Sequence, residues 1–201
     1  MDFDKIYSIN FDSAIEFLNY MRDNYPKYYT NHYIPLRAIA YDNYDKQVTE
    51  YIPKYTEFAN VPFACKAWVD NYLHGDYERP LSLVLIGYSR TGKTEWARSL
   101  GRHIYMACYF NLSLWDDEAE YIFVDDMDVP GKKLEEYFRS WKAFFGAQKE
   151  FTLTDKYAKK KRVTWGKPMI YISNNEIECN TKTMDYIRKN SIIVNVYSEF
   201  Y

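Results

Sequence analysis

The strongest chemical signal in this sequence is a short loop bracketed by glycines. Residues 87–94 read GYSRTGKT and match the pattern GxxxxGK[ST] in full. Glycines leave backbone N–H groups free to point into one concavity, where they can bind phosphate oxygens. We expect Lys93 to reach the β- and γ-phosphates of a nucleotide and the Thr94 hydroxyl to bind Mg²⁺. The residues expected at the nucleotide are Gly87, Ser89, Arg90, Thr91, Gly92, Lys93, Thr94 and Glu95.

Two carboxylates end the stretch YIFVDD at residues 121–126. A carboxylate at the end of a neighbouring strand can hold the metal of such a site. A second one can accept a proton from the water that attacks the γ-phosphate. We therefore assign metal binding to Asp125 and the role of general base to Asp126. The alternative is an acidic loop without chemistry, a description that fits Asp128 better.

A neutral polar group follows a third apolar run, MIYISNN, at residues 169–175. An amide in this position can orient the attacking water and sense the γ-phosphate without adding charge beside Mg²⁺. Asparagine after a strand is also common in turns, so the assignment depends on the two elements before it. We choose Asn174 as the catalytic amide.

A basic stretch, residues 145–168, lies between the carboxylates and this amide. Its sequence, FGAQKEFTLTDKYAKKKRVTWGKP, predicts a strand, a lysine-rich turn and a second strand. Single-stranded nucleic acid binds clustered cations through its backbone and aromatic rings through its bases, and Tyr157 and Trp165 could supply the rings. A solvated charged turn is the alternative. The cations at the tip are Lys159, Lys160, Lys161 and Arg162.

Buried strands and helices must hold these groups together. Apolar runs predict strands at 81–86, 105–110, 121–126, 168–175 and 191–196, and amphipathic patterns predict helices at about 12–24, 62–73, from 93 onward, and 132–146. The alternation of strands and helices along the chain indicates an α/β fold, in which helices cover both faces of a mostly parallel sheet. We expect a small helical region over residues 1–75 and a P-loop ATPase domain over residues 76–201.

Composition limits the classes of protein that need consideration. The net charge is -2, but residues 111–128 hold seven acidic groups and no basic one, whereas residues 141–167 hold eight basic groups and two acidic ones. The three cysteines, Cys65, Cys108 and Cys179, show no metal-binding spacing and suit a reducing compartment. No secretory signal or membrane-spanning run occurs, so we expect an intracellular soluble protein without membrane partners.

Taken together, the motifs resemble the superfamily 3 helicase domain of the replication initiator (Rep) proteins of geminivirus-like circular single-stranded DNA viruses. RPLSLVLIGYSRTGKTEWARSLG is similar to the family's Walker A segment, and YIFVDD to Walker B. FFGAQKEFTLTDKY resembles motif B′, and KPMIYISNN resembles motif C. The similarity runs from about residue 58 to residue 175, with all four motifs in order. By this resemblance, the helical region over residues 1–75 occupies the place of the family's oligomerisation region.

The resemblance implies an AAA+-like ATPase that forms a hexameric ring and unwinds DNA in the 3′-to-5′ direction during rolling-circle replication. ATP and Mg²⁺ are the implied cofactors. Single-stranded DNA, further copies of the chain and host replication factors are the implied partners, in the host nucleus. By position, the residues that grip DNA would be Lys156, Lys159, Lys160 and Lys161, and Arg188 would be the arginine finger offered to a neighbouring subunit. Arg98 and Arg102 are the alternatives for that finger.

The resemblance has one gap. Full-length initiators carry a nuclease domain with a His-hydrophobic-His pair, whereas His32, His74 and His103 each stand alone here. We therefore expect no DNA nicking or joining from this chain. Two other hypotheses remain: a module that binds nucleotide to lock an oligomer and does little work, and a small-molecule kinase. The kinase would need a lid and an acceptor pocket, and neither accounts for the basic hairpin.

Overall fold

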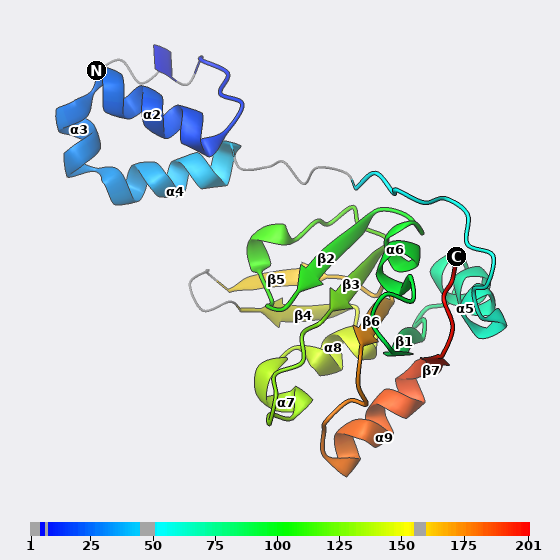
Figure 1. Cartoon of the computed structure of the whole chain (residues 1–201). Coiled ribbons are helices and arrows are strands. Elements are labelled where there is room, and N and C mark those ends of the chain that lie inside the picture. The colour runs from blue at the N-terminus through cyan, green and yellow to red at the C-terminus, as the bar shows by residue number, and fades with distance from the viewer. Residues whose placement is uncertain (1–4, 7, 45–50, 155–159) are drawn as a thin grey trace. The chain divides into compact units, whose positions relative to one another are not determined.

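The computed structural model describes residues 5–6, 8–44, 51–154 and 160–201. The chain forms two compact units, Met1–Thr49 and Glu50–Tyr201 (Figure 1). The units therefore divide at 49/50 and not at 75/76. The reason is that Val61, Cys65 and Trp68 are buried against the sheet of the second unit, which draws the segment before residue 75 into it.

The first unit consists of helices packed on an aromatic core. Most of its described residues belong to α2 (Ala14–Asn24), α3 (Pro26–Asn31) and α4 (Tyr33–Tyr44). The predicted start of α2 is confirmed, since the Ser13 hydroxyl at the N-cap accepts the Glu16 backbone N–H at 3.1 Å. Pro26 at the first position of α3 suits a helix start because its missing N–H would have no intrahelical partner.

A five-stranded parallel sheet forms the centre of the second unit (Figure 1). The strands are β1 (Ser82–Gly87), β2 (His103–Ala107), β3 (Tyr121–Asp125), β6 (Met169–Ser173) and β7 (Ser191–Val196), in the order β2-β3-β6-β1-β7. All four pairings are parallel, so the predicted α/β class with a mostly parallel sheet is confirmed.

Helices cover both faces of the sheet because its strands are apolar on both sides. Leu83 and Leu85 of β1 face one core, with α5 (Phe63–Trp68), the π-helix η1 (Val69–Leu73) and α6 (Lys93–Arg98). Val84 between them faces the other core, with η2 (Leu112–Leu114), α7 (Leu134–Tyr137), α8 (Trp141–Phe145) and α9 (Thr181–Asn190). This alternation is the period of two expected of a strand.

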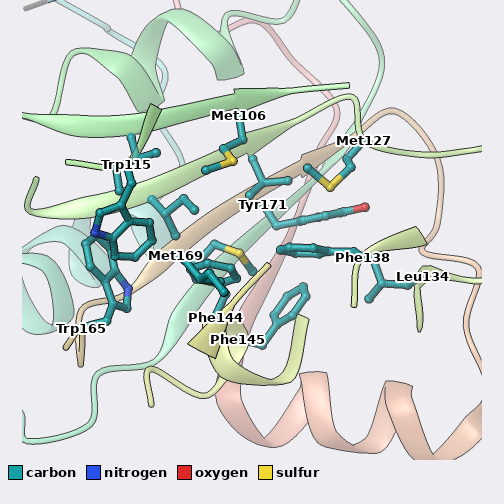
Figure 2. Close-up of a cluster of buried hydrophobic side chains, with 14 of the residues drawn as sticks. Met106, Trp115, Met127, Leu134, Phe138, Phe144, Phe145, Trp165, Met169 and Tyr171 are labelled. Carbon is teal, nitrogen blue, oxygen red and sulfur yellow. The ribbon is translucent and has the colours of Figure 1, made fainter. Parts of the chain in front are cut away.

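The single helix predicted over 132–146 is wrong, because α7 and α8 are separate. Phe138 leaves helical geometry at φ -107° and ψ 73°. The break lets Phe138 stack on Phe144, with centroids 5.7 Å apart, although residues six apart point away from each other on a straight helix. The apolar residues of this amphipathic pattern still face the core, where Leu134, Phe138 and Phe145 are buried (Figure 2).

The basic stretch forms the predicted hairpin, in which β4 (Glu150–Leu153) pairs antiparallel with β5 (Lys161–Thr164). Lys161 and Arg162 belong to β5 and not to the tip. Trp165 is buried beside Trp115, with ring centroids 5.0 Å apart, so the prediction that it stacks on DNA bases is wrong (Figure 2). Lys156, Tyr157 and Lys159 lie outside the described residues.

No helix in the described parts of the chain combines the length and the apolar character that crossing a bilayer requires.

Candidate active site

Three strand ends meet at one edge of the sheet and form a pocket of about 210 Å³. The register of the parallel strands explains why they meet. Asp125 of β3 lies opposite Ile172 of β6, and Ser173 lies opposite Ile86 of β1. The loop after β1, the carboxylates after β3 and the amide after β6 therefore emerge side by side, which is where open parallel sheets bind ligands.

The loop at residues 87–94, which we call the phosphate loop, requires glycine at two positions. A side chain at Gly87 would place its Cβ 2.1 Å from the Val196 carbonyl oxygen of β7. Gly92 has a φ of 84°, in the left-handed region, and directly precedes α6. Arg90 also has a positive φ, 64°. The loop thus turns its backbone sharply before the helix begins.

Lys93 is the most enclosed charge of the pocket, with 3% of its surface exposed. Its ammonium donates to the carbonyl oxygens of Gly87 and Tyr88 at 2.9 and 2.6 Å and to the Thr91 hydroxyl at 3.1 Å. Burial lowers the Lys93 pKa, and the charges of Asp125 and Asp126 oppose this shift. All three ammonium N–H groups are occupied by the loop, so an anion entering the pocket must exchange with at least one of these partners.

Thr94 and Asp125 lie next to each other at the carboxyl end of β3. The Thr94 hydroxyl donates to Asp125 Oδ2 at 3.0 Å, and the Tyr105 hydroxyl donates to the same oxygen at 3.3 Å. Burial raises the pKa of Asp125 above its ordinary value, and these two hydrogen bonds only partly offset the shift. A hydroxyl and a carboxylate side by side are oxygen donors of the kind that Mg²⁺ prefers.

Because burial disfavours the ionised form of Asp125, Asp125→Asn is expected to raise the melting temperature of the nucleotide-free protein near neutral pH. The folded chain holds the Asp125 proton more tightly than the unfolded chain, so stability from this group is full below the unfolded pKa and is lost as the pH rises through the folded one. An amide does not ionise and avoids that decline.

Melting curves of both proteins across a pH series check this expectation. Asp125→Asn should raise the melting temperature by about 2–4 °C for each kcal/mol of added stability in a chain of this size. This rise should disappear as the pH falls to 3.8, the ordinary pKa of an aspartate. A lower melting temperature at neutral pH, or a gain independent of pH, contradicts it.

Asp126 and Asn174 form the second polar pair of the pocket. The Asn174 side-chain amide donates to Asp126 Oδ1 at 3.0 Å, and both residues are exposed to solvent. Asp126 has a φ of 46°, so the backbone leaves the extended conformation immediately after Asp125. As a result, consecutive carboxylates have different surroundings, one buried against Thr94 and the other accessible beside an amide.

Asp128 binds neighbouring hydroxyl groups and does not line this pocket. Its carboxylate accepts the hydroxyls of Tyr137 at 3.3 Å, Tyr171 at 2.7 Å and Ser173 at 2.5 Å. Ser173 directly precedes Asn174, so this cluster ties the turn after β3 to the end of β6. The assignment of Asp128 as the acid outside the chemistry stays a prediction.

The remaining candidates that the structure describes, Arg188, Lys160 and Lys161, do not line the pocket. Arg188 is exposed on α9 and does not line it. Lys160 is exposed next to β5, and Lys161 pairs with Asp117 at 3.4 Å, near the Trp115 ring. The structure therefore brings together the phosphate loop, both carboxylates and Asn174, and it leaves Arg188, Lys160 and Lys161 outside the pocket.

Sequence reasoning missed two tyrosines of the site. Tyr105 donates to Asp125, and Tyr201 lines the pocket beside Gly92. With 22 tyrosines in the chain, no local pattern distinguishes these two from the rest. Their roles depend on strand pairing and on the return of the chain after β7.

Comparison with known proteins shows similarity to replication-associated proteins of viruses over most of the chain. Residues 3–96 match the sequence profile described as the geminivirus rep protein central domain. A replication-associated protein of Cabbage leaf curl virus (isolate Jamaica) is 33% identical over 181 residues, covering 85% of this chain and 51% of that protein. The counterpart from Tobacco yellow dwarf virus (strain Australia) is 33% identical over 172 residues, covering 82% and 48%. The chain thus spans about half the length of these curated relatives.

Two further similarities are more limited. The replication-associated protein of Sugarcane streak virus (isolate South Africa) is 37% identical over 132 residues, covering 64% of this chain and 35% of that protein. A crystal structure of JCV helicase with a bound thiazolopyridine compound is 13% identical and has a TM-score of 0.38, covering 66% of this chain and 38% of that one. A TM-score this low does not establish a shared fold.

Proposed function

We propose that this chain is the ATP-hydrolysing motor part of a viral replication protein and that it moves along single-stranded DNA. One observation carries the proposal: a phosphate loop with a buried lysine, a hydroxyl–carboxylate pair and a carboxylate–amide pair converge on one pocket. The similarity to replication-associated proteins of two viruses supports a role in viral replication.

The phosphate loop accounts for binding of the triphosphate. Its backbone and the start of α6 offer N–H groups to the phosphates, and Lys93 adds a positive charge. Lys93 exchanges its hydrogen bonds with Gly87, Tyr88 and Thr91 for phosphate oxygens. Burial lowers the Lys93 pKa because it disfavours the charged ammonium. The negative charge of a bound nucleotide offsets that cost and therefore favours the charged form.

The two acidic positions divide the chemistry between them. Thr94 and Asp125 would hold Mg²⁺, which supplies charge neutralisation at the terminal phosphates. Asp126 accepts the proton of the attacking water, because its carboxylate is accessible to solvent. Asn174, hydrogen-bonded to Asp126, orients that water. The products are ADP and phosphate, and the proton leaves through Asp126 to solvent.

Movement on DNA requires a group that binds the strand and a partner that completes the ATP site. We assign the first role to the basic hairpin, through Lys156, Lys159, Lys160 and Lys161, and the second to Arg188 from a neighbouring copy in a hexameric ring with 3′-to-5′ polarity. Both alternatives to Arg188 are engaged within their own subunit. Arg98 lies 3.5 Å from the Tyr51 ring and 4.2 Å from the Tyr105 ring, and Arg102 binds Asp116 at 2.7 and 3.1 Å.

The direct test is ATP turnover with and without a single-stranded oligonucleotide, together with native mass measurement of the assembly. We expect turnover that rises when DNA is added, in an oligomer. ATP binding without turnover, with or without DNA, would instead favour a module that locks an oligomer. No ATP binding at all would refute the proposal.

Replacing Lys159 and Lys160 by Ala is expected to remove the stimulation of ATP turnover by DNA. Both positions belong to the basic stretch, and Lys160 is exposed. With fewer cations at DNA phosphates, binding also depends less on salt, and the slope of log affinity against log salt should fall by about 0.7 for each lysine that pairs with a phosphate of the single strand. Turnover assays and binding isotherms at several salt concentrations measure the two effects.

The matched control is the double variant Lys66→Ala/Lys182→Ala, which removes the same charge from exposed positions on α5 and α9. It should retain the stimulation. If the Lys159/Lys160 variant is stimulated as strongly as the control, the assignment of the hairpin to DNA is wrong.

A further inference from the structure

The proposed chemistry uses the polar groups of the pocket and leaves Tyr201 without a role. Tyr201 lines the same pocket as Lys93 and Asn174, and 43% of its surface is exposed. Its ring lies directly on the phosphate loop, because a Cβ added to Gly92 would be 3.0 Å from the ring edge. An exposed aromatic ring thus adjoins the loop segment that is expected to cradle phosphates.

The segment that carries Tyr201 is held in place from several sides. The Phe200 N–H donates to the Thr91 carbonyl oxygen of the phosphate loop at 2.9 Å. Asn60 donates its backbone N–H to the Phe200 carbonyl at 3.1 Å and its side-chain amide to the Tyr201 carbonyl at 2.5 Å. Phe200 is itself buried, with its ring edge against Trp96 of α6. These contacts order Tyr201 before any ligand binds.

Two other rings support the Tyr201 side chain. Phe58 stacks on it with centroids 5.8 Å apart and an angle of 30° between the planes. Tyr55 meets it edge to face with centroids 5.0 Å apart, and 40% of Tyr55 is exposed. We call these three residues, Tyr55, Phe58 and Tyr201, the aromatic platform. It places apolar ring surface next to a pocket whose other described groups are mostly polar or charged.

We infer that the aromatic platform binds the nucleobase of the nucleoside triphosphate whose phosphates occupy the pocket. Lys93, Thr94 and Asp125 account for the terminal phosphates, and Asp126 with Asn174 flanks the site of water attack. The nucleoside must therefore leave the pocket along another part of its lining, and Tyr201 provides a flat apolar surface there. Bases stack on aromatic side chains because every base has a π-face.

This binding mode also predicts which nucleotides the site accepts. Stacking depends on ring area more than on the hydrogen-bonding edge of the base, so purine nucleoside triphosphates should bind more tightly than pyrimidine ones. The inference rests on the proposed function of the phosphate loop, and a ligand that has phosphates but no base separates the two.

The test compares ATP with inorganic tripolyphosphate, which presents the same kind of phosphate chain without a base. Calorimetric titrations of the full chain in Mg²⁺ buffer give both affinities. Tyr201→Ala should weaken ATP binding roughly tenfold to a hundredfold, the range expected for removal of one base–aromatic stack. The affinity of the Tyr201→Ala protein for tripolyphosphate should differ from that of the wild type by less than about twofold, as for a surface substitution. Tyr201→Phe, which keeps the ring, should bind ATP like the wild type.

Two more variants sharpen the result. Tyr55→Ala should weaken ATP binding less than Tyr201→Ala, because it removes only the ring that supports the stack. Tyr197→Ala removes an equally large exposed ring close by in the chain, outside the pocket, and should leave both affinities unchanged.

The outcomes distinguish the two proposals. If Tyr201→Ala weakens ATP and tripolyphosphate equally, Tyr201 only maintains the loop and the platform is refuted. If the wild type binds tripolyphosphate as tightly as ATP, the platform is again refuted while the phosphate loop stands. If the wild type binds neither, the proposed function fails and the platform fails with it.

Discussion

Replacing Lys93 by Met is expected to lower ATP turnover at least about a hundredfold, the effect typical of removing one preorganised charged donor at a phosphoryl-transfer site. The physical reason is the burial of Lys93 at the base of the pocket, where few water molecules can replace its charge. Met retains the length and apolar stem of the side chain. The measurements are steady-state turnover and calorimetric ATP affinity.

The Lys93→Met protein should still fold. Burial lowers the Lys93 pKa, so an uncharged side chain avoids the cost of holding an ammonium inside the pocket before nucleotide binds. The carbonyl oxygens of Gly87 and Tyr88 would be without this donor, which limits any gain in stability. A thermal melt with one cooperative transition establishes folding, and Lys66→Ala on the exposed face of α5 serves as the charge control. Turnover within about threefold of wild type, well short of the expected decrease, would refute the role of Lys93.

Asp126→Asn is expected to lower kcat by about 10²–10⁴, the usual contribution of a positioned general base. Its KM for ATP should change little, because Asp126 acts on the attacking water and not on the bound phosphates. The substitution keeps the shape of the side chain beside Asn174, 3.0 Å away. Initial-rate kinetics over a range of ATP concentrations separate the two parameters.

Asp125→Asn is the informative comparison for this variant. It should change the dependence of turnover on Mg²⁺ concentration, whereas Asp126→Asn should leave that dependence as in the wild type. Asp185→Asn, at a solvent-accessible position of α9, controls for the removal of one carboxylate. An Asp126→Asn protein with normal kcat, or with raised KM and normal kcat, would show that the two aspartates have other roles.

Much of the site follows from local sequence because its parts are strand ends. In a parallel sheet, the residues that follow each strand emerge at the same edge, so Gly87, Asp125 and Asn174 converge once their strands are identified. Each strand here is short, apolar and bounded by polar residues or glycine, which makes it visible in the sequence. The phosphate loop adds two glycines whose positions the backbone requires.

Other predictions failed where the packing of particular side chains decides the outcome. The stripe from Leu134 to Phe145 predicts which side chains are buried but not the break at Phe138, which depends on stacking against Phe144. Trp165 stands next to cations in the sequence, yet the sheet places it beside Trp115 in the core (Figure 2). A local pattern contains no information about which buried neighbour a ring will meet.

The sequence by itself thus determined the phosphate loop, the paired carboxylates, the amide and the strands that carry them, because each of these depends on residues close together in the chain. Only the tertiary structure decided the division after residue 49 and the placement of Tyr201 on Gly92. The physical reason is sequence separation: Tyr201 lies far along the chain from the loop and Tyr55 well before it. These residues meet only after β7 pairs with β1 and returns the final residues to the pocket.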